Sequence, residues 1–369
     1  MGGELDAASG PSYGVEEEFL LVDKAGRPLA LSPEVVRRAA EQGVELQLEM
    51  TEAQVEVATE KAASSTALGE QIRSLRQAAA SSARQAGAVL VAAALPPGGS
   101  GPGPLRGTDR YRWMSDRLGM VTDERENCGC HVHVEVPSRD AAIEVSNWLR
   151  PWLPLMLALT ANSAIYRGVN TRHASWRNVM WSRWPSAGPP PYFEAAADYD
   201  RAVTMLLESG AMLDHGMVYW HVRASTRFPT VEVRVADVPA TAAETVLYAT
   251  LVRAAVVAAL ARYERGERAP RVPDHMLRLA CWSAAREGLG GHLIDIANCG
   301  KIVTTVHLLG VWLATLRPAL EELGEYGWVC NELRTLMREG NGAMRQLHAW
   351  QSGENTADVV AALAAATLA

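Results

Sequence analysis

The stretch that decides the fold reads Gly14-Val15-Glu16-Glu17-Glu18-Phe19. Side chains on a β-strand point alternately to its two faces, so Glu16 and Glu18 share one face, while the residues between them point the other way. The stretch therefore predicts a strand that carries two carboxylates on one face.

Three further segments alternate in the same way, with acids, histidines or an arginine at every second position. They are Leu46 to Thr59 with Glu49, Glu52 and Glu56, Cys130 to Glu135 with His131, His133 and Glu135, and Val231 to Asp237 with Glu232 and Arg234. Together the four segments predict a sheet with one face on a core and the other lined with charge. Charged side chains on such a face are costly unless they are paired, solvated or bound to cations. Each segment taken alone is equally typical of a surface strand with a solvated polar face.

Composition indicates a soluble intracellular enzyme. The 369 residues are 48% hydrophobic and 21% charged, which is ordinary for a globular protein, and the net charge of −7 argues against a nucleic-acid surface. No basic region precedes an apolar run, and no window reaches about 18 uninterrupted apolar residues, so we expect neither secretion nor membrane spanning, and a cytoplasmic location. The five cysteines lack the paired spacings of structural zinc sites and are expected to be reduced.

The order of the expected elements favours one α+β domain over residues 1–369, with the motifs in 13–288 and a helical part in 289–369. Strand patterns alternate with helical patterns up to the segment 230–237, and helices are expected from there to the end. An apolar helix over 139–161 is expected to bend at Pro151 and Pro154. The Ala-rich segment 356–368 is expected to be a helix that is either docked or frayed.

The segment 166–193 differs from the rest because it has no clear period. It contains four arginines, three tryptophans and a Pro-Pro-Pro run. Long loops are usually functional or disordered, and this density of Trp and Arg argues against disorder. We interpret the segment as a loop that covers a substrate; the alternative is a surface excursion held by aromatic packing.

The residue types on the charged face predict a metal-nucleotide site. Carboxylates with an imidazole are hard ligands that suit Mg²⁺, or Mn²⁺, and Mg²⁺ typically joins one or two carboxylates to substrate phosphates. Five or six acids suggest two or three ions, with ATP phosphates as further ligands. The chain has neither a His-Glu-x-x-His zinc motif nor a Gly-x-x-x-x-Gly-Lys-Ser/Thr phosphate loop.

The ordered motifs resemble the carboxylate-amine ligase family, the bacterial type 2 glutamate-cysteine ligases. The motifs are Gly-Val-Glu-Glu-Glu at 14–18, Gln-Val-Glu-Val-Ala-Thr at 54–59, Cys-Gly-Cys-His-Val-His-Val at 128–134, Trp-Ser-Arg-Trp-Pro-Ser-Ala-Gly-Pro-Pro-Pro at 181–191 and Arg-Phe-Pro-Thr-Val-Glu-Val-Arg-Val-Ala-Asp at 227–237. The resemblance covers residues 13 to about 288.

This resemblance implies a glutamine synthetase-like fold, in which a curved antiparallel sheet forms a funnel covered by helices. The apolar helices leave room for a homodimer. It also implies an enzyme that activates a carboxylate, typically the γ-carboxylate of glutamate, with ATP and joins it to an amine such as cysteine.

The resemblance further implies roles for individual residues. Glu16, Glu49 and Glu56 look like ligands of one or two Mg²⁺ ions, and Glu18, His131 and Glu232 like ligands shared with the phosphates. Arg234 would stabilise the transferring phosphoryl group, and Arg177 matches the arginine that binds the acceptor's α-carboxylate.

Two positions depart from the family pattern and weaken the assignment of glutamate and cysteine as substrates. The chain has Ala94-Leu95-Pro96-Pro97 where members often have Gly-Thr-His-Pro, and Glu135 where they often have glycine. A family variant that acts on another acid or amine therefore stays open. So do a metal-dependent amide hydrolase, which would need no nucleotide, and a non-catalytic relative that binds a metabolite or a protein.

Overall fold

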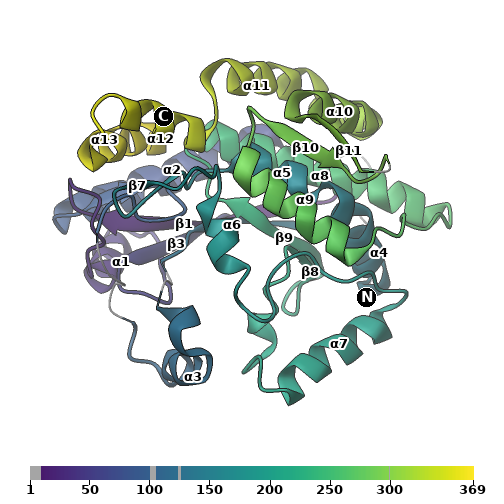
Figure 1. Cartoon of the computed structure of the whole chain (residues 1–369), viewed down its shortest axis with the longest axis horizontal. Coiled ribbons are helices and arrows are strands. Elements are labelled where there is room, and N and C mark those ends of the chain that lie inside the picture. The colour runs from purple at the N-terminus through teal and green to yellow at the C-terminus, as the bar shows by residue number, and fades with distance from the viewer. Residues whose placement is uncertain (1–9, 100–104, 124–125, 299) are drawn as a thin grey trace.

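The computed structural model describes residues 10–99, 105–123, 126–298 and 300–369, and an antiparallel sheet of seven strands lies at its centre (Figure 1). The strand order is β2-β3-β1-β5-β9-β8, with β4 also paired to β1. The strands are β1 (Tyr13–Val22), β2 (Gln47–Leu48), β3 (Gln54–Ala58), β4 (Val89–Val91), β5 (Gly129–Glu135), β8 (Val222–Ala224) and β9 (Thr230–Asp237). The stretch quoted first thus forms a central strand that pairs with three others.

Helices and two short hairpins complete the described part of the chain. The helices are α1 (Ser32–Glu41), α2 (Ser65–Gln85), α3 (Asp109–Leu118), α4 (Arg139–Leu149), α5 (Leu153–Thr160), α6 (Trp176–Trp181), α7 (Ala196–Glu208), α8 (Ala242–Glu264), α9 (Asp274–Glu287), α10 (Thr305–Glu322), α11 (Tyr326–Glu339), α12 (Gly342–Gln351) and α13 (Thr356–Thr367). The hairpins are β6 (Ile165–Tyr166) with β7 (Val169–Asn170), and β10 (His292–Asp295) with β11 (Lys301–Thr304). The predicted α+β fold, an antiparallel sheet covered by helices, is confirmed.

One face of the sheet packs on helices, and Glu17 of β1 points to that side. Its carboxylate accepts two hydrogen bonds from Arg76 of α2, at 2.5 and 3.0 Å, and one from the Thr245 hydroxyl of α8 at 2.6 Å. Arg76 also donates to the carbonyls of Ala240 and Thr367. Both charged side chains are only 1% exposed, so this Arg76–Glu17 pair depends on its hydrogen bonds to offset desolvation.

Helix α8 is the long apolar helix behind the sheet. It is the one helix of the described residues whose length and composition would allow it to cross a membrane, but 78% of its apolar window is buried inside the protein. It packs on β1, β5, α2 and α4, as a core helix does.

The Ala-rich segment near the end forms a docked helix, α13. Val359, Val360 and Leu363 are buried in the same hydrophobic cluster as Leu90 and Val91 of β4. The Thr367 hydroxyl accepts a hydrogen bond from the Ala92 N–H at 2.9 Å. Helix α13 therefore packs beside β4, and Figure 1 shows it next to α12.

Several local predictions need correction. The part after β9 is not wholly helical, because β10 and β11 form a hairpin between α9 and α10. The segment 166–193 contains α6 and most of the β6–β7 hairpin, so it is more regular than predicted.

The predicted bend in the apolar helix over 139–161 is confirmed: a 3-10 turn, Arg150–Trp152, separates α4 from α5. Four cysteines are free thiols, while Cys299 lies outside the described residues.

Candidate active site

The charged face of the sheet forms one wall of a pocket of about 230 Å³. Helix α3, helix α6 and the segment before β8 supply the other walls. The lining residues are Glu16, Glu18, Glu49, Met50, Gln54, Glu56, Arg110, Tyr111, Asn127, His131, Arg177, Trp181, Gly216, Tyr219 and Arg234. One side of the pocket is thus acidic, and Tyr111, Trp181 and Tyr219 make another side aromatic.

Three acids form the first group of neighbouring ligand atoms, which we call the carboxylate cluster: Glu18, Glu49 and Glu56. One oxygen of each lies within 4.8 Å of the others. The register of β1 and β3 places Glu18 directly opposite Glu56, and Glu49 follows β2 at the sheet edge. Three carboxylate oxygens at this spacing are a ligand set that suits a divalent cation.

The carboxylate cluster is electrostatically unfavourable in its charged form. Burial, together with the charge of Glu49, raises the pKa of Glu18 to about 8. Burial and the neighbouring charges of Glu49, Glu16 and Glu18 raise the pKa of Glu56 to about 11. Since like charges in a low-dielectric site disfavour ionisation, a bound cation would reverse both shifts.

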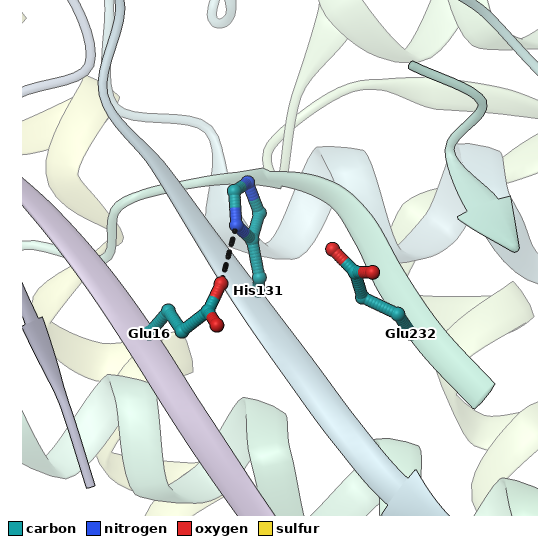
Figure 2. A group of neighbouring side chains, drawn as sticks. All are labelled: Glu16, His131 and Glu232. Carbon is teal, nitrogen blue, oxygen red and sulfur yellow. Dashed lines mark hydrogen bonds and ion pairs between the residues drawn. The ribbon is translucent and has the colours of Figure 1, made fainter. Parts of the chain in front are cut away.

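The second group, which we call the histidine cluster, consists of Glu16, His131 and Glu232 (Figure 2). It spans three adjacent strands, because the register places Glu16 of β1 opposite His131 of β5. The His131 Nδ1 lies 3.1 Å from Glu16 Oε2. His133, two residues along β5, lies opposite Glu232, with its Nε2 3.5 Å from Glu16 Oε1 and 3.9 Å from Glu232 Oε1.

Two arginines neutralise the histidine cluster. Arg223 of β8 donates to both oxygens of Glu232, at 2.7 and 3.1 Å, and Arg234 pairs with the same carboxylate. Burial alone would raise the pKa of Glu232, but Arg234 and Arg223 together lower it below its ordinary value. The pKa of Glu16 is also lowered, because its hydrogen bonds with His131 and His133 outweigh burial.

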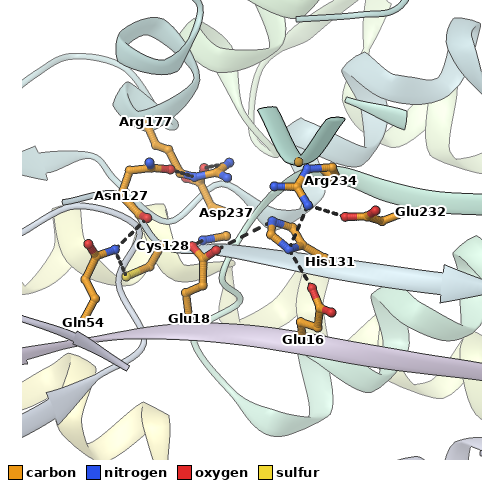
Figure 3. A network of polar contacts seen from close by, with 12 residues as sticks. Glu16, Glu18, Gln54, Asn127, Cys128, His131, Arg177, Glu232, Arg234 and Asp237 are labelled. Atoms are coloured by element: carbon orange, nitrogen blue, oxygen red, sulfur yellow. Dashed lines mark hydrogen bonds and ion pairs between the residues drawn. The ribbon is translucent and has the colours of Figure 1, made fainter. Parts of the chain in front are cut away.

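Burial and the charge of Arg234 lower the pKa of His131 to about 4. The imidazole is therefore neutral near pH 7, which is the form that can coordinate a metal. Its Nδ1 also lies 3.3 Å from Arg234 Nη1, so the tautomer decides whether this nitrogen donates to Glu16 or accepts from Arg234 (Figure 3).

A β-bulge aims Arg234 at this cluster. Between the paired residues Cys130–Ala236 and Val132–Val233, β5 has one residue, His131, whereas β9 has two, Arg234 and Val235. An extra residue bends a strand and redirects its side chains. The Arg234 N–H donates to the His221 carbonyl at 2.7 Å instead of pairing with β5.

Arg177 of α6 reaches the site from outside the sheet (Figure 3). Its Nε donates to Asn127 Oδ1 at 2.8 Å, and its Nη1 lies 3.7 Å from Asp237 Oδ1. Asp237 is fully buried and accepts hydrogen bonds from the Asn162 N–H and the hydroxyls of Ser163 and Ser175. Arg177, of which only 4% is exposed, thus projects a positive charge into the pocket beside Glu18.

The structure brings all eight predicted site residues together on the charged face of the sheet or beside it. Their grouping differs from the prediction, because Glu18 lies with Glu49 and Glu56, while Glu16 lies with His131 and Glu232. Glu18 also lies near His131, with its Oε1 3.9 Å from His131 Nε2. The ligand and phosphate roles themselves stay predictions.

Some site residues escaped the sequence analysis, and two suspected positions lie elsewhere. Arg223, Asn127 and Tyr219 were not predicted, although each contacts or lines the site. Neither Leu95 nor Glu135 is among the described lining residues; Glu135 accepts a hydrogen bond from Ser12 at 2.6 Å instead. Within the described lining, neither departure from the family pattern therefore contributes a side chain to the pocket.

The predicted covering loop contributes to the site through α6. Arg177 and Trp181 line the pocket, and Trp181 packs against Trp184 and Tyr219 with ring centroids 5.0 and 4.8 Å apart. Both interpretations of segment 166–193 are thus partly realised, since aromatic packing holds the residues that face the pocket.

Comparison with known proteins places this geometry in a family. The model of "Glutamate-cysteine ligase family 2(GCS2)" matches residues 12–362. The chain belongs to this family. A protein of Mycolicibacterium smegmatis described as "Putative glutamate--cysteine ligase 2-3" is 54% identical over 98% of this chain and 100% of its own length. A Nocardia farcinica protein described as a ligase of the same type, 2-1, is 51% identical over 97% of this chain and 94% of its own length.

Solved structures support the same fold at much lower identity. A bifunctional glutathione synthetase from Pasteurella multocida matches with a TM-score of 0.70 at 14% identity, over 98% of this chain and 53% of that chain. A glutamate–cysteine ligase from Francisella tularensis, in complex with AMP, matches with a TM-score of 0.66 at 12% identity, over 97% and 88%. The prediction of an ATP-dependent ligase of the glutamate-cysteine ligase type is thereby confirmed.

Proposed function

We propose that this member of the glutamate-cysteine ligase family 2 activates the γ-carboxylate of glutamate with ATP and joins it to an amine, with cysteine as the first candidate. The observation that carries the proposal is the meeting of two metal-ligand clusters with Arg234 and Arg177 in one pocket. The names of the relatives and the AMP bound to the Francisella tularensis neighbour support it.

The two clusters fit Mg²⁺ or Mn²⁺. Their donors are carboxylate oxygens and one neutral imidazole, and the raised pKa values of Glu18 and Glu56 indicate a site that lacks positive charge. Glu18, Glu49 and Glu56 would hold one ion, and Glu16, His131 and Glu232 a second. Bound ions would supply positive charge that bridges and neutralises the ATP phosphates.

The proposed reaction has two steps. In the first, a carboxylate oxygen attacks the γ-phosphorus of ATP; the bond to the β-phosphate oxygen breaks, which gives an acyl phosphate and ADP. In the second, the amine nitrogen attacks the acyl carbon and loses a proton, and the bond to the phosphate oxygen breaks. The products are an amide and inorganic phosphate. Activation is necessary because a carboxylate is a poor acyl donor.

The chain's own residues position the reactants and stabilise charge. Arg234, fixed by Glu232 and the β-bulge, places its guanidinium beside the histidine cluster, where it can stabilise the transferring phosphoryl group. Arg223 keeps Glu232 oriented. Arg177 offers its charge to a substrate carboxylate beside Glu18, and the rings of Tyr111, Trp181 and Tyr219 line the same pocket.

Further predictions from the sequence remain proposals. These proposals are the cytoplasmic location, the homodimer and the single-domain organisation. The proposed reaction type would also hold for an acid other than glutamate or an amine other than cysteine, because the residues that line the pocket do not identify the substrates.

The test is phosphate release from ATP and Mg²⁺, screened over amino acids as acceptors of the phosphoryl group, each with a pool of amines. The expected result is ADP and phosphate formed only with a particular acid and amine, and the matching amide detected by mass spectrometry. Amide cleavage that needs metal but no nucleotide would instead assign a hydrolase. If neither phosphate release nor amide cleavage is detected, the result would favour a binding protein.

A matched pair of variants controls the screen. Glu232→Gln should abolish the signal, because it removes one ligand and leaves Arg223 and Arg234 without their carboxylate. Glu52→Gln makes the same chemical change at a partly exposed position outside the pocket lining, so its activity should equal that of the wild type.

A further inference from the structure

Gly129, the first residue of β5, lies between the carboxylate cluster and Arg177. Its N–H donates to Glu18 Oε2 at 2.7 Å, which makes Gly129 a direct neighbour of the acid. On the β9 side it pairs with Asp237, the carboxylate beside Arg177. One glycine therefore contacts both the anionic and the cationic part of the pocket.

The space over Gly129 is filled by the Arg177 guanidinium. A Cβ at position 129 would lie 2.5 Å from Arg177 Nη2, 3.3 Å from its Cζ and 3.2 Å from His131 Nε2. The first distance is far inside van der Waals contact between carbon and nitrogen, so the guanidinium would have to move.

Arg177 cannot make that move freely. Its Nε is hydrogen-bonded to Asn127, its Nη1 lies near Asp237, and only 4% of the residue is exposed. Displacement would break the charge-assisted contacts that hold the side chain over the strand. The direction open to the guanidinium is the pocket, which Arg177 already lines.

We propose that Gly129 is a positioning residue: its missing side chain sets how closely the Arg177 guanidinium approaches Glu18 and the substrate anion bound there. The inference rests on the proposed function in one respect, the identity of that anion as a substrate carboxylate or phosphate. The positioning of Arg177 by Gly129 does not depend on the reaction.

Gly129→Ala tests the proposal, with Gly14→Ala as the matched control. Gly14 is also in a strand of this sheet, but a Cβ there would lie 3.5 Å from Thr59 Oγ1, an ordinary contact. Neither glycine is restricted to a left-handed backbone conformation, so the two substitutions differ mainly in what the new methyl group meets.

The first readout needs no activity. Wild type, Gly129→Ala and Gly14→Ala are treated with phenylglyoxal, which modifies accessible arginines, and modification of Arg177 is mapped by mass spectrometry. We expect Arg177 to be protected in the wild type and in the control, and to react at least about 10-fold faster in Gly129→Ala, because the displaced side chain enters the pocket. Equal protection in all three proteins would overturn the proposal.

The second readout is a double-mutant cycle with Arg177→Ala, using the acid and amine found in the substrate screen. Loss of a well-aligned charge-assisted hydrogen bond predicts that Gly129→Ala raises KM for the acid about 10- to 100-fold, with a smaller change in kcat. The effect should vanish in the Arg177→Ala background, because the two residues act through one side chain. If the increases in KM caused by Gly129→Ala and Arg177→Ala instead multiply in the double variant, the proposal is overturned.

The two readouts separate the possible failures. If Arg177 becomes reactive in Gly129→Ala but the wild type shows no ligase activity with any acid and amine, the proposed function fails and the positioning role stands. If the wild type is an active ligase and Arg177 stays protected, the positioning role fails alone. Circular dichroism and thermal unfolding show that each variant is folded before either result is interpreted.

Discussion

The carboxylate cluster and the histidine cluster lie on the same sheet face, yet their surroundings are opposite. Burial acts to raise the pKa of all four acids, but their partners differ. Beside Glu18 and Glu56 the charge of Glu49 adds to burial, and their pKa values are raised. Beside Glu16 the histidines, and beside Glu232 the arginines, outweigh burial, and these pKa values are lowered. The comparison teaches that burial alone does not decide the charge state of these acids, because the partners decide whether burial prevails.

The strongest test of this comparison is to neutralise one acid in each cluster. Glu232→Gln and Glu56→Gln should each lower turnover by about 10³-fold, since both remove a ligand from the site. Their effects on metal-free stability should have opposite signs. Glu232→Gln should destabilise by about 3–5 kcal/mol because it leaves two arginines without a partner, whereas Glu56→Gln should stabilise.

Phosphate release and urea unfolding in a chelator measure these two quantities. Stability changes of the same sign in both variants would contradict the comparison, because they would mean that the partners of the two acids do not distinguish them.

The buried Arg76–Glu17 pair extends the comparison to the helical face. Arg76→Met leaves the Glu17 carboxylate buried with only the Thr245 hydroxyl, so the free energy of unfolding should fall by about 3–5 kcal/mol. Turnover per folded molecule should stay within about twofold, because the pair lies on the face opposite the pocket. Chemical unfolding with active-site titration measures both, and a large loss of kcat in fully folded protein would refute this separation of structure from site.

Metal-free stability should depend on pH through the carboxylate cluster. Glu18 and Glu56 have folded pKa values of about 8 and about 11, above the ordinary 4.5, so the folded state keeps protons that the unfolded chain has released. Stability therefore falls as pH rises from about 4.5 towards 8 for Glu18 and towards 11 for Glu56. With nearly two protons released on unfolding, the slope from these two groups should be about 2–3 kcal/mol per pH unit between pH 6 and 7.5.

Saturating Mg²⁺ should reduce this slope, because a cation replaces the protons. Urea unfolding at several pH values, with Mg²⁺ or with a chelator, measures it. Parallel pH profiles in the two conditions would count against a cation site at Glu18, Glu49 and Glu56.

The smallest expected effect is that of Glu135→Gly, which restores the residue that family members often have. Glu135 is outside the described pocket lining and accepts one hydrogen bond from Ser12. Stability should change by less than about 1 kcal/mol, and kcat and KM should be unchanged. A shift in substrate preference, measured in the same acid and amine screen, would show that this position reaches the site after all.

The alternating pattern predicted the strands and the face of the sheet that carries Glu16, Glu18, His131, Glu232 and Arg234. It could not assign Glu16 and Glu18 to different clusters, because the two acids are equivalent within β1. Only strand register distinguishes them, since Glu16 lies opposite His131 and Glu18 opposite Glu56.

Other features were hidden for different physical reasons. Arg223 is the one charged residue of the three-residue strand β8, too short to show a period, and only the register with β9 reveals its partner Glu232. The β10–β11 hairpin has strands of four residues and runs directly into the apolar helix α10. Arg177 lies in a segment whose sequence has no clear period, although it forms α6, so only the family resemblance indicated it.

The contact between Thr367 and Arg76 has a consequence for the order of events during synthesis. Arg76 and Glu17 leave the ribosome early, but the Thr367 carbonyl that Arg76 binds, and the hydroxyl that meets Ala92, follow nearly 300 residues later. Arg76 of α2, the partner of Glu17 in the central strand, is therefore fully hydrogen-bonded only after α13 has been made. Until then this part of the core is incomplete, and chaperones would have their longest access to the nascent chain in this interval.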